Sequence, residues 1–149
     1  MNETRRSWPV SALVLAAAGL ALAGTGLYFI FLRPPLLPED VRFMGLSSAQ
    51  LDVVRPHFEA WLTQVFRVFG GYILATGVLT ITLAATSFRA YHRGAAVGAA
   101  IGGAASIGLM AAVNFSIDSD FKWVLLAIAL VWASSLVLFW TEMMTPSNP

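Results

Sequence analysis

The sequence predicts an all-α polytopic membrane protein: one domain, residues 1–149, folded as a bundle of four transmembrane helices. Hydrophobic residues make up 58% of the 149-residue chain and charged residues only 11%, whereas a soluble domain carries about 25% charged residues. The charged residues are also absent from four blocks of 19 to 26 residues. A helix needs roughly 20 apolar residues to cross a bilayer core about 30 Å thick. The four blocks are residues 7–32, 68–88, 94–117 and 123–141.

The composition also excludes several classes of function. None of the blocks alternates in polarity as a membrane-spanning strand does. The chain has no cysteine, which excludes disulfides and thiolate metal sites. A net charge of +1 argues against a nucleic-acid partner, since such binding needs a clustered basic face. No histidine set, nucleophile–base pair or nucleotide loop is present, so we expect no metal and no cofactor.

The first predicted element is a helix over 8–32. Pro9 suits its first turn, where a missing N–H costs nothing, and Pro34 and Pro35 end it. The apolar run is longer than the 7–15 residues of a typical signal-peptide core. We therefore expect this helix to be retained as a membrane anchor, with a cleaved signal peptide as the alternative.

Residues 33–55 form the only sizeable segment outside the four blocks. The stretch "RPPLLPEDVRFMGL" is apolar-rich, and we expect it to run extended along the bundle or the membrane interface. Ser47 and Gln50 form a capping box. A short amphipathic helix over about 48–54, lying on the membrane surface, is predicted to follow.

Pro56 is predicted to open the second spanning helix, whose transmembrane part covers 66–88. Its first turns should project from the membrane, since 33 residues from Pro56 to Phe88 would extend about 50 Å. These turns carry a polar group that is either a proton-handling or headgroup-binding site or a solvated amphipathic turn. Its members are His57, Glu59, Gln64 and Arg67.

The third spanning helix, 94–115, begins with the small-residue run "GAAVGAAIGGAASIG". A row at four-residue steps is predicted to be a helix-packing interface: Gly94, Gly98, Gly102 and Ser106. Small-xxx-small rows let helix backbones approach closely in lipid. A parallel row comprises Ala95, Ala99 and Gly103. Packing within one bundle and contact with a second copy or a larger membrane complex both remain open.

The fourth spanning helix is predicted over 121–143, followed by a disordered tail over 144–149. Trp132 lies mid-helix, where its indole N–H needs a partner, so we expect a polar pocket or an interhelical bond there. We expect Asn114 to bond across helices or cap the third helix. Asp118 and Asp120 are interpreted as acids favouring the start of the fourth helix, rather than as a cation site.

Orientation depends on lysine and arginine near the membrane. With the N-terminus inside, the cytoplasmic residues are Arg5, Arg6, Arg89 and Arg93, and the opposite side has Arg33, Arg42, Arg55, Arg67 and Lys122. The inside arginines lie in very short segments, and six of the eight acids fall outside. We therefore predict that both termini are cytoplasmic.

One stretch resembles a known group of families. The segments "LPEDVRFMGLSSAQL" and "FRVFGGYILATGVL", which span about 36–80, resemble small bacterial four-helix membrane proteins of the DoxX-like kind. The resemblance implies a bacterial inner (plasma) membrane and, for some members, association with membrane oxidoreductases. It carries over no catalytic residue.

Two functions follow as expectations. The first is a non-catalytic accessory or scaffolding subunit that assembles through the third helix. The second is a membrane protein or enzyme that binds a lipid or quinone, accessory to a membrane oxidoreductase, with a pocket near Trp132 and a mouth at His57, Glu59 and Arg67. Membrane lipids are the expected small-molecule partners. A transporter is disfavoured because no charged residue lies in the middle of a span.

Overall fold

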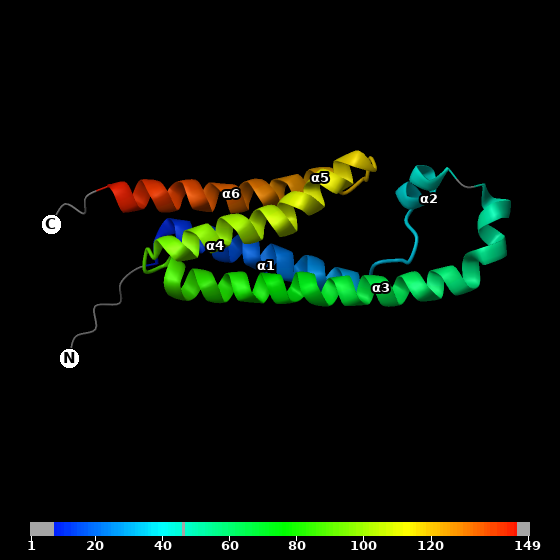
Figure 1. The fold of residues 1–149 in the computed structure, drawn as a ribbon, viewed down its shortest axis with the longest axis horizontal. Coiled ribbons are helices and arrows are strands. Elements are labelled where there is room, and N and C mark those ends of the chain that lie inside the picture. Colours follow the sequence, from blue (N-terminus) through cyan, green and yellow to red (C-terminus); the bar gives the residue numbers. More distant parts are fainter. Residues whose placement is uncertain (1–7, 46, 146–149) are drawn as a thin grey trace.

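A computed structural model describes residues 8–45 and 47–145. The elements are α1 (Val10–Phe31), α2 (Pro38–Met44), α3 (Ser48–Leu83), the π-helical turn η1 (Ala84–Phe88), α4 (Arg93–Gly103), the π-helical turn η2 (Ala104–Gly108), α5 (Leu109–Ser116) and α6 (Lys122–Met144) (Figure 1). The part of the chain that the structure describes contains no strand. The predicted all-α fold class is thereby confirmed. Of the predicted disordered tail, 146–149 lie outside the described residues.

Four helical stretches are long and apolar enough to cross a membrane, and they match the four predicted spans: Val10–Phe31, Arg55–Phe88, Arg93–Ser116 and Lys122–Met144. Each exposes large apolar side chains on its outer face, for example Leu20, Leu79, Ile101 and Leu130. A surface of this kind is costly in water and suits hydrocarbon. These features are consistent with an integral membrane protein.

Two predictions for residues 33–56 are wrong. The stretch after Pro35 is not extended throughout, because α2 forms over Pro38–Met44 and ends at Gly45 with φ 65°, a left-handed conformation typical of helix ends. The helix over 48–54 is not separate, because α3 runs on from Ser48 with Pro56 inside it. The first turns of α3 lie at a steep angle to the rest (Figure 1), as expected where a proline removes a helical bond. The predicted capping box at Ser47 and Gln50 is confirmed.

The third span is not one regular helix. The turn η2 separates α4 from α5, and η1 similarly ends α3. A π-turn adds one residue to the helical repeat and is frequent at functional sites. Within η2, the Ser106 hydroxyl donates to the Gly102 carbonyl at 2.5 Å. The helix predicted over 94–115 is therefore interrupted by a π-helical turn within its small-residue run.

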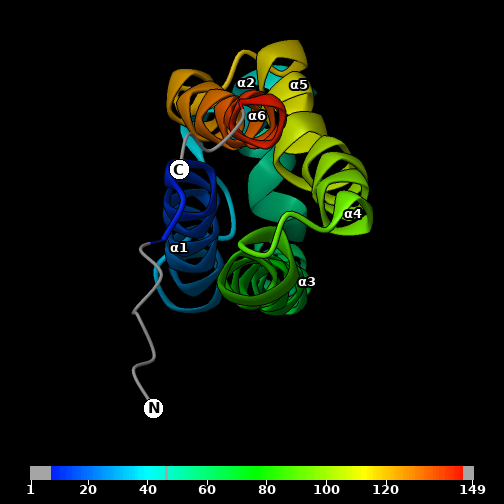
Figure 2. The same cartoon turned by 90° about the vertical axis from the view of Figure 1, so that its left-hand side faces the viewer.

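The four helical stretches pack in an open series. Helix α1 packs along α3 on one side and along α6 on the other, and α6 continues to α4 and α5 (Figure 2). Among the described residues, no extended backbone contact joins α3 to α4 or α5. At the end of the bundle where α3 finishes, the turn η1 contacts α4, so the two sides of the series meet there. At the other end the two sides remain apart.

The most extensive contact joins α1 to α3, and four glycines lie in it. They are Gly19 and Gly26 on α1 and Gly70 and Gly77 on α3. A Cβ at Gly77 would lie 2.5 Å from the backbone nitrogen of Ala23, and a Cβ at Gly26 would lie 2.5 Å from that of Leu74. No real Cβ is accommodated at such distances, so the two backbones touch directly. Close backbone contact of this kind drives helix association in lipid.

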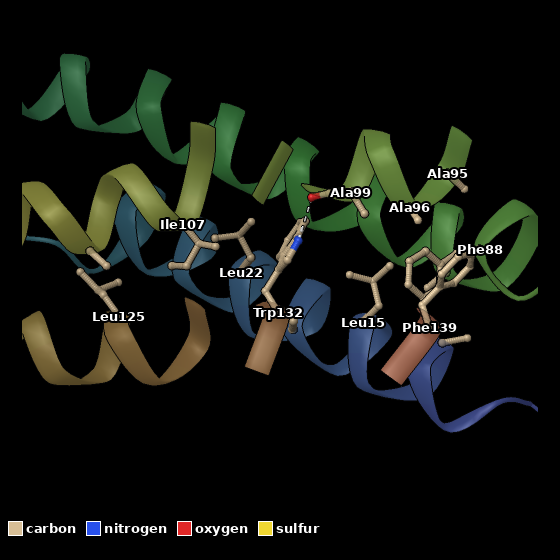
Figure 3. Close-up of a cluster of buried hydrophobic side chains, with 14 residues drawn as sticks. Leu15, Leu22, Phe88, Ala95, Ala96, Ala99, Ile107, Leu125, Trp132 and Phe139 are labelled. Carbon is tan, nitrogen blue, oxygen red and sulfur yellow. Dashed lines mark hydrogen bonds between the residues drawn. The ribbon is translucent and has the colours of Figure 1, made fainter. Parts of the chain in front are cut away.

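The closed end is held by a polar network and a buried core. The Glu142 carboxylate of α6 accepts from the Ser11 backbone N–H at 3.1 Å, the Ser11 hydroxyl at 2.5 Å and the Tyr91 hydroxyl at 3.2 Å. It thereby caps the start of α1, where Pro9 supplies no side-chain cap. Beside it, the rings of Phe88 and Phe139 lie 4.6 Å apart between centroids (Figure 3).

The α1–α3 contact gives a matched pair of predictions. Gly77→Ala should destabilise the protein by about 1–3 kcal/mol, as overpacking of a tight contact does, because its new Cβ meets backbone. Gly71→Ala should be neutral or stabilising, because Gly71 is on the same helix and has nothing within 4 Å of its Cβ position. Thermal unfolding of the solubilised protein measures both. Equal effects of the two substitutions would contradict the contact.

Candidate functional site

A cavity of about 950 Å³ lies at the open end of the bundle. Its walls come from α1, α2, α3, η2, α5, α6 and the loop before α6. The lining comprises a large apolar part and a small polar end. The polar-end residues are Arg33, Glu39, Asp40, Asn114 and Ser119.

The mouth of the cavity lies between α3 and α5. Phe69 and Tyr72 on α3 and Leu109 and Val113 on α5 line the cavity and are also exposed at the surface. All four lie within stretches long and apolar enough to span a membrane. The cavity therefore opens sideways through an apolar part of the surface, where a bilayer would present hydrocarbon.

The cavity is elongated along α1. Its deepest α1 residue is Leu22, and from Leu22 to Phe31, the last residue of α1, the helix rises about 14 Å. This is close to half of a bilayer core about 30 Å thick. The cavity thus has the depth of one membrane leaflet, with its polar groups at the end of α1.

An ion pair occupies part of the polar end. The Arg33 guanidinium contacts the Asp40 carboxylate at 3.1 Å, and the Arg33 side chain is only 8% exposed. It also donates to the Pro34 carbonyl at 2.9 Å and lies 3.4 Å above the Phe66 ring. Arginine over an aromatic face is a stabilising cation–π arrangement. Arg33 thus lies in the cavity wall with its charge balanced by Asp40.

Glu39 is the second acid of the polar end and is 2% exposed. The Ser119 hydroxyl donates to one of its carboxylate oxygens at 3.2 Å, and no other described residue hydrogen-bonds this carboxylate. Among the described residues, no fully enclosed side-chain oxygen lacks a partner. Since Glu39 lines the cavity, its second oxygen meets open space there.

Helix α2, which supplies Glu39 and Asp40, is fixed to the turn before α6. Arg42 donates to the Asp118 carbonyl at 2.8 Å and lies 3.8 Å from the Asp120 carboxylate. Asp118 has φ 53° and pairs with Lys122. The hydrogen bond from Lys122, together with the positive charge of that ammonium, lowers the pKa of Asp118 below its ordinary value of 3.8. Asp118 and Asp120 therefore hold the turn before α6 against α2.

Other polar side chains near the cavity mostly satisfy their own helices. Thr76 donates to the Tyr72 carbonyl at 2.8 Å, the usual return of a threonine hydroxyl to the preceding helical turn. Asn114 donates to the Met110 carbonyl of its own helix at 2.8 Å, so the prediction that it bonds across helices or caps the third helix is wrong. No described residue donates to its side-chain oxygen.

The polar residues in the first turns of α3, which were predicted to form the mouth of a site, do not lie at the cavity. His57, Gln64 and Arg67 are exposed, and none of them lines the large cavity. Glu59 pairs with Arg55 at 2.8 Å. This arrangement is that of an amphipathic, exposed helical face.

Trp132 and the row of Gly94, Gly98, Gly102 and Ser106 do not form one site: Trp132 packs on the other row of α4. The Trp132 indole N–H donates to the Ala99 carbonyl at 2.9 Å, which is the interhelical bond expected as one alternative (Figure 3). Gly103 lies against the same indole, so the row packed on α6 is that of Ala99 and Gly103. In the predicted row, Cβ atoms at Gly94, Gly98 and Gly102 would meet nothing within 4 Å, and Ser106 lines the cavity.

Sequence reasoning missed Arg33, Glu39 and Ser119 as members of one site. A signal was present: Glu39 and Asp40 follow an apolar "PPLLP" run, where acids have little solvent unless they face a polar interior. The four-helix topology also places this loop and the turn before α6 at the same end. No group of three or more metal-ligating side chains occurs within 8–45 and 47–145.

Comparison of the chain with family models, curated proteins and solved structures gave no match. The resemblance to DoxX-like families stays a prediction.

The pair of Asp118 and Lys122 predicts a specific titration. Lys122→Gln should raise the pKa of Asp118 toward 3.8, because it removes the ammonium that favours the charged carboxylate. In the wild type, the lowered pKa means that this pair stabilises the fold above the unfolded-state pKa and that the stabilisation is lost as pH falls through the folded-state value. Carboxyl carbon-13 NMR of the selectively labelled protein measures the shift; an unchanged Asp118 titration would contradict the pairing.

Proposed function

We propose that the protein is an integral membrane protein that takes an amphiphilic molecule from the bilayer into the cavity between α3 and α5. One observation carries this proposal: the cavity of about 950 Å³ opens through exposed apolar residues and ends in a polar group of side chains. Ligand pockets of 300–1,000 Å³ with few convergent polar groups are typical binding sites. A lipid or quinone has the matching division into a polar end and an apolar chain.

The polar end supports binding rather than transport through the bundle. The closed end is filled by Phe88, Phe139 and the Glu142 network, so the cavity does not extend to the other face. Charged lining groups are confined to the open end. The proposal includes a bacterial inner membrane, both termini cytoplasmic and an accessory role beside a membrane oxidoreductase, all of which come from the sequence alone.

Cavity filling tests the proposal with a matched pair in η2. Ala105→Phe should abolish a co-purified amphiphile, because Ala105 lines the cavity, whereas Ala104→Phe should leave it bound, because Ala104 is also exposed and lies outside the lining. Native mass spectrometry of the gently solubilised proteins measures the bound mass. A ligand retained in Ala105→Phe, or absent from the wild type in every lipid tested, would contradict the proposal.

A second candidate function is assembly through the outer face of α4. Its supporting observation is that Gly94, Gly98 and Gly102 have open space where a Cβ would be. A row of small residues that no helix of its own chain covers could receive a helix of a second copy or of a partner. This matches the accessory-subunit function expected from the sequence.

Assembly through α4 predicts that Gly98→Leu weakens an oligomer or complex without unfolding the subunit, since the added side chain meets nothing within its own chain. Gly71→Leu is the control, because Gly71 is also uncovered and lies on another helix. Mass photometry in nanodiscs and thermal unfolding measure the two effects. An assembly state unchanged by Gly98→Leu would rule this candidate out.

A further inference from the structure

Resting on the proposed function, we propose that the cavity selects amphiphiles whose polar end bears a protonated amine, with Glu39 as the counter-charge. Glu39 is 2% exposed and lines the cavity. Its only hydrogen bond from a described residue comes from Ser119 at 3.2 Å. A buried carboxylate with an oxygen on open space is costly unless a ligand supplies a donor or an opposite charge.

The charges of the polar end determine which sign of charge the ligand's polar group should carry. Arg33 contributes one positive charge to the lining, and Asp40 and Glu39 contribute one negative charge each. Arg33 is committed to Asp40 at 3.1 Å and to the Phe66 ring at 3.4 Å. No other lysine or arginine is part of the lining. An anionic headgroup would therefore meet an uncompensated carboxylate, whereas a cation would balance it.

The neighbouring groups also suit an ammonium. An ammonium has three donors and no acceptor. Glu39 and the side-chain oxygen of Asn114, which receives no hydrogen bond from a described residue, are acceptors in the same lining. Aromatic rings of Tyr28 and Phe121, with centroids 6.2 Å apart, line the same cavity. Aromatic faces attract cations.

The test measures a matched pair of single-chain probes in phosphatidylcholine nanodiscs. Hexadecylamine and N-hexadecylacetamide share a chain, but only the first is charged at neutral pH, since alkylamines titrate near pH 10. Binding is followed by native mass spectrometry. We expect the wild type to favour hexadecylamine by about tenfold or more, the range of a hydrogen bond to a charged group. Glu39→Gln should abolish the preference and Glu59→Gln, on an outer face, should keep it.

The outcomes separate this inference from the proposed function. Equal binding of both probes by the wild type, or a preference that survives in Glu39→Gln, would overturn the inference while leaving the cavity as an amphiphile site. Binding of neither probe would overturn both. The wild-type comparison needs no variant, so it stands even where Glu39→Gln fails to fold. Where the preference is found, competition by phosphatidylethanolamine assigns the amine to a lipid headgroup, and its absence assigns it to a single-chain amine.

Discussion

The direct contact of the α1 and α3 backbones is the constraint on which the rest of the arrangement depends. Gly26 and Gly77 leave no room for a Cβ against the opposite helix, so these two helices form one closely fitted unit. In lipid, apolar burial gives little net drive for helices to associate, and such close contacts supply it instead. Because α3 packs on α1 and α1 also packs on α6, α1 is the helix on which both α3 and α6 are assembled.

In that assembly, the described residues of α3 and α5 face each other without extended backbone contact. Among the described residues, α4 and α5 make their main contacts with α6, which packs on α1, and η1 contacts α4 at one end of the series. The Glu142 network with Ser11 and the Phe88–Phe139 pair fill the end where they meet. At the opposite end the helices stay apart and leave the cavity. Helix α2 covers part of this end, where Arg42 holds it to the turn before α6. The cavity thus follows from which helices are in contact.

The sequence predicted the four spans closely because charge-free length is a direct physical requirement of a bilayer. It predicted the Trp132 partner bond as one alternative for a similar reason, since a buried N–H must be satisfied. It missed α2, because the proline-rich stretch that contains it was expected to be extended. It missed the joined start of α3, because Pro56 was interpreted as a helix start, whereas α3 continues through it with a bend. For α4 it offered two rows of small residues, and the structure distinguishes them: Ala99 is buried within the chain, whereas Gly98 faces open space.

The site was harder to predict because its residues are far apart in the chain and paired by the fold. Glu39 meets Ser119 across 80 positions, and neither residue belongs to a motif. His57 and Arg67 are polar and belong to the same stretch of sequence, but both lie on the exposed face of α3. Proximity along the chain could identify a polar helix face, whereas a cavity requires knowing which helices fail to pack together.

Electron cryomicroscopy of the wild-type protein in lipid nanodiscs, with a rigid fusion partner, would show directly whether the cavity between α3 and α5 holds a ligand. We expect α1 and α3 in backbone contact, α3 and α5 apart, and elongated non-protein density between α3 and α5 that ends beside Glu39. A map in which α3 packs directly on α5 and leaves no space for a ligand would contradict this expectation.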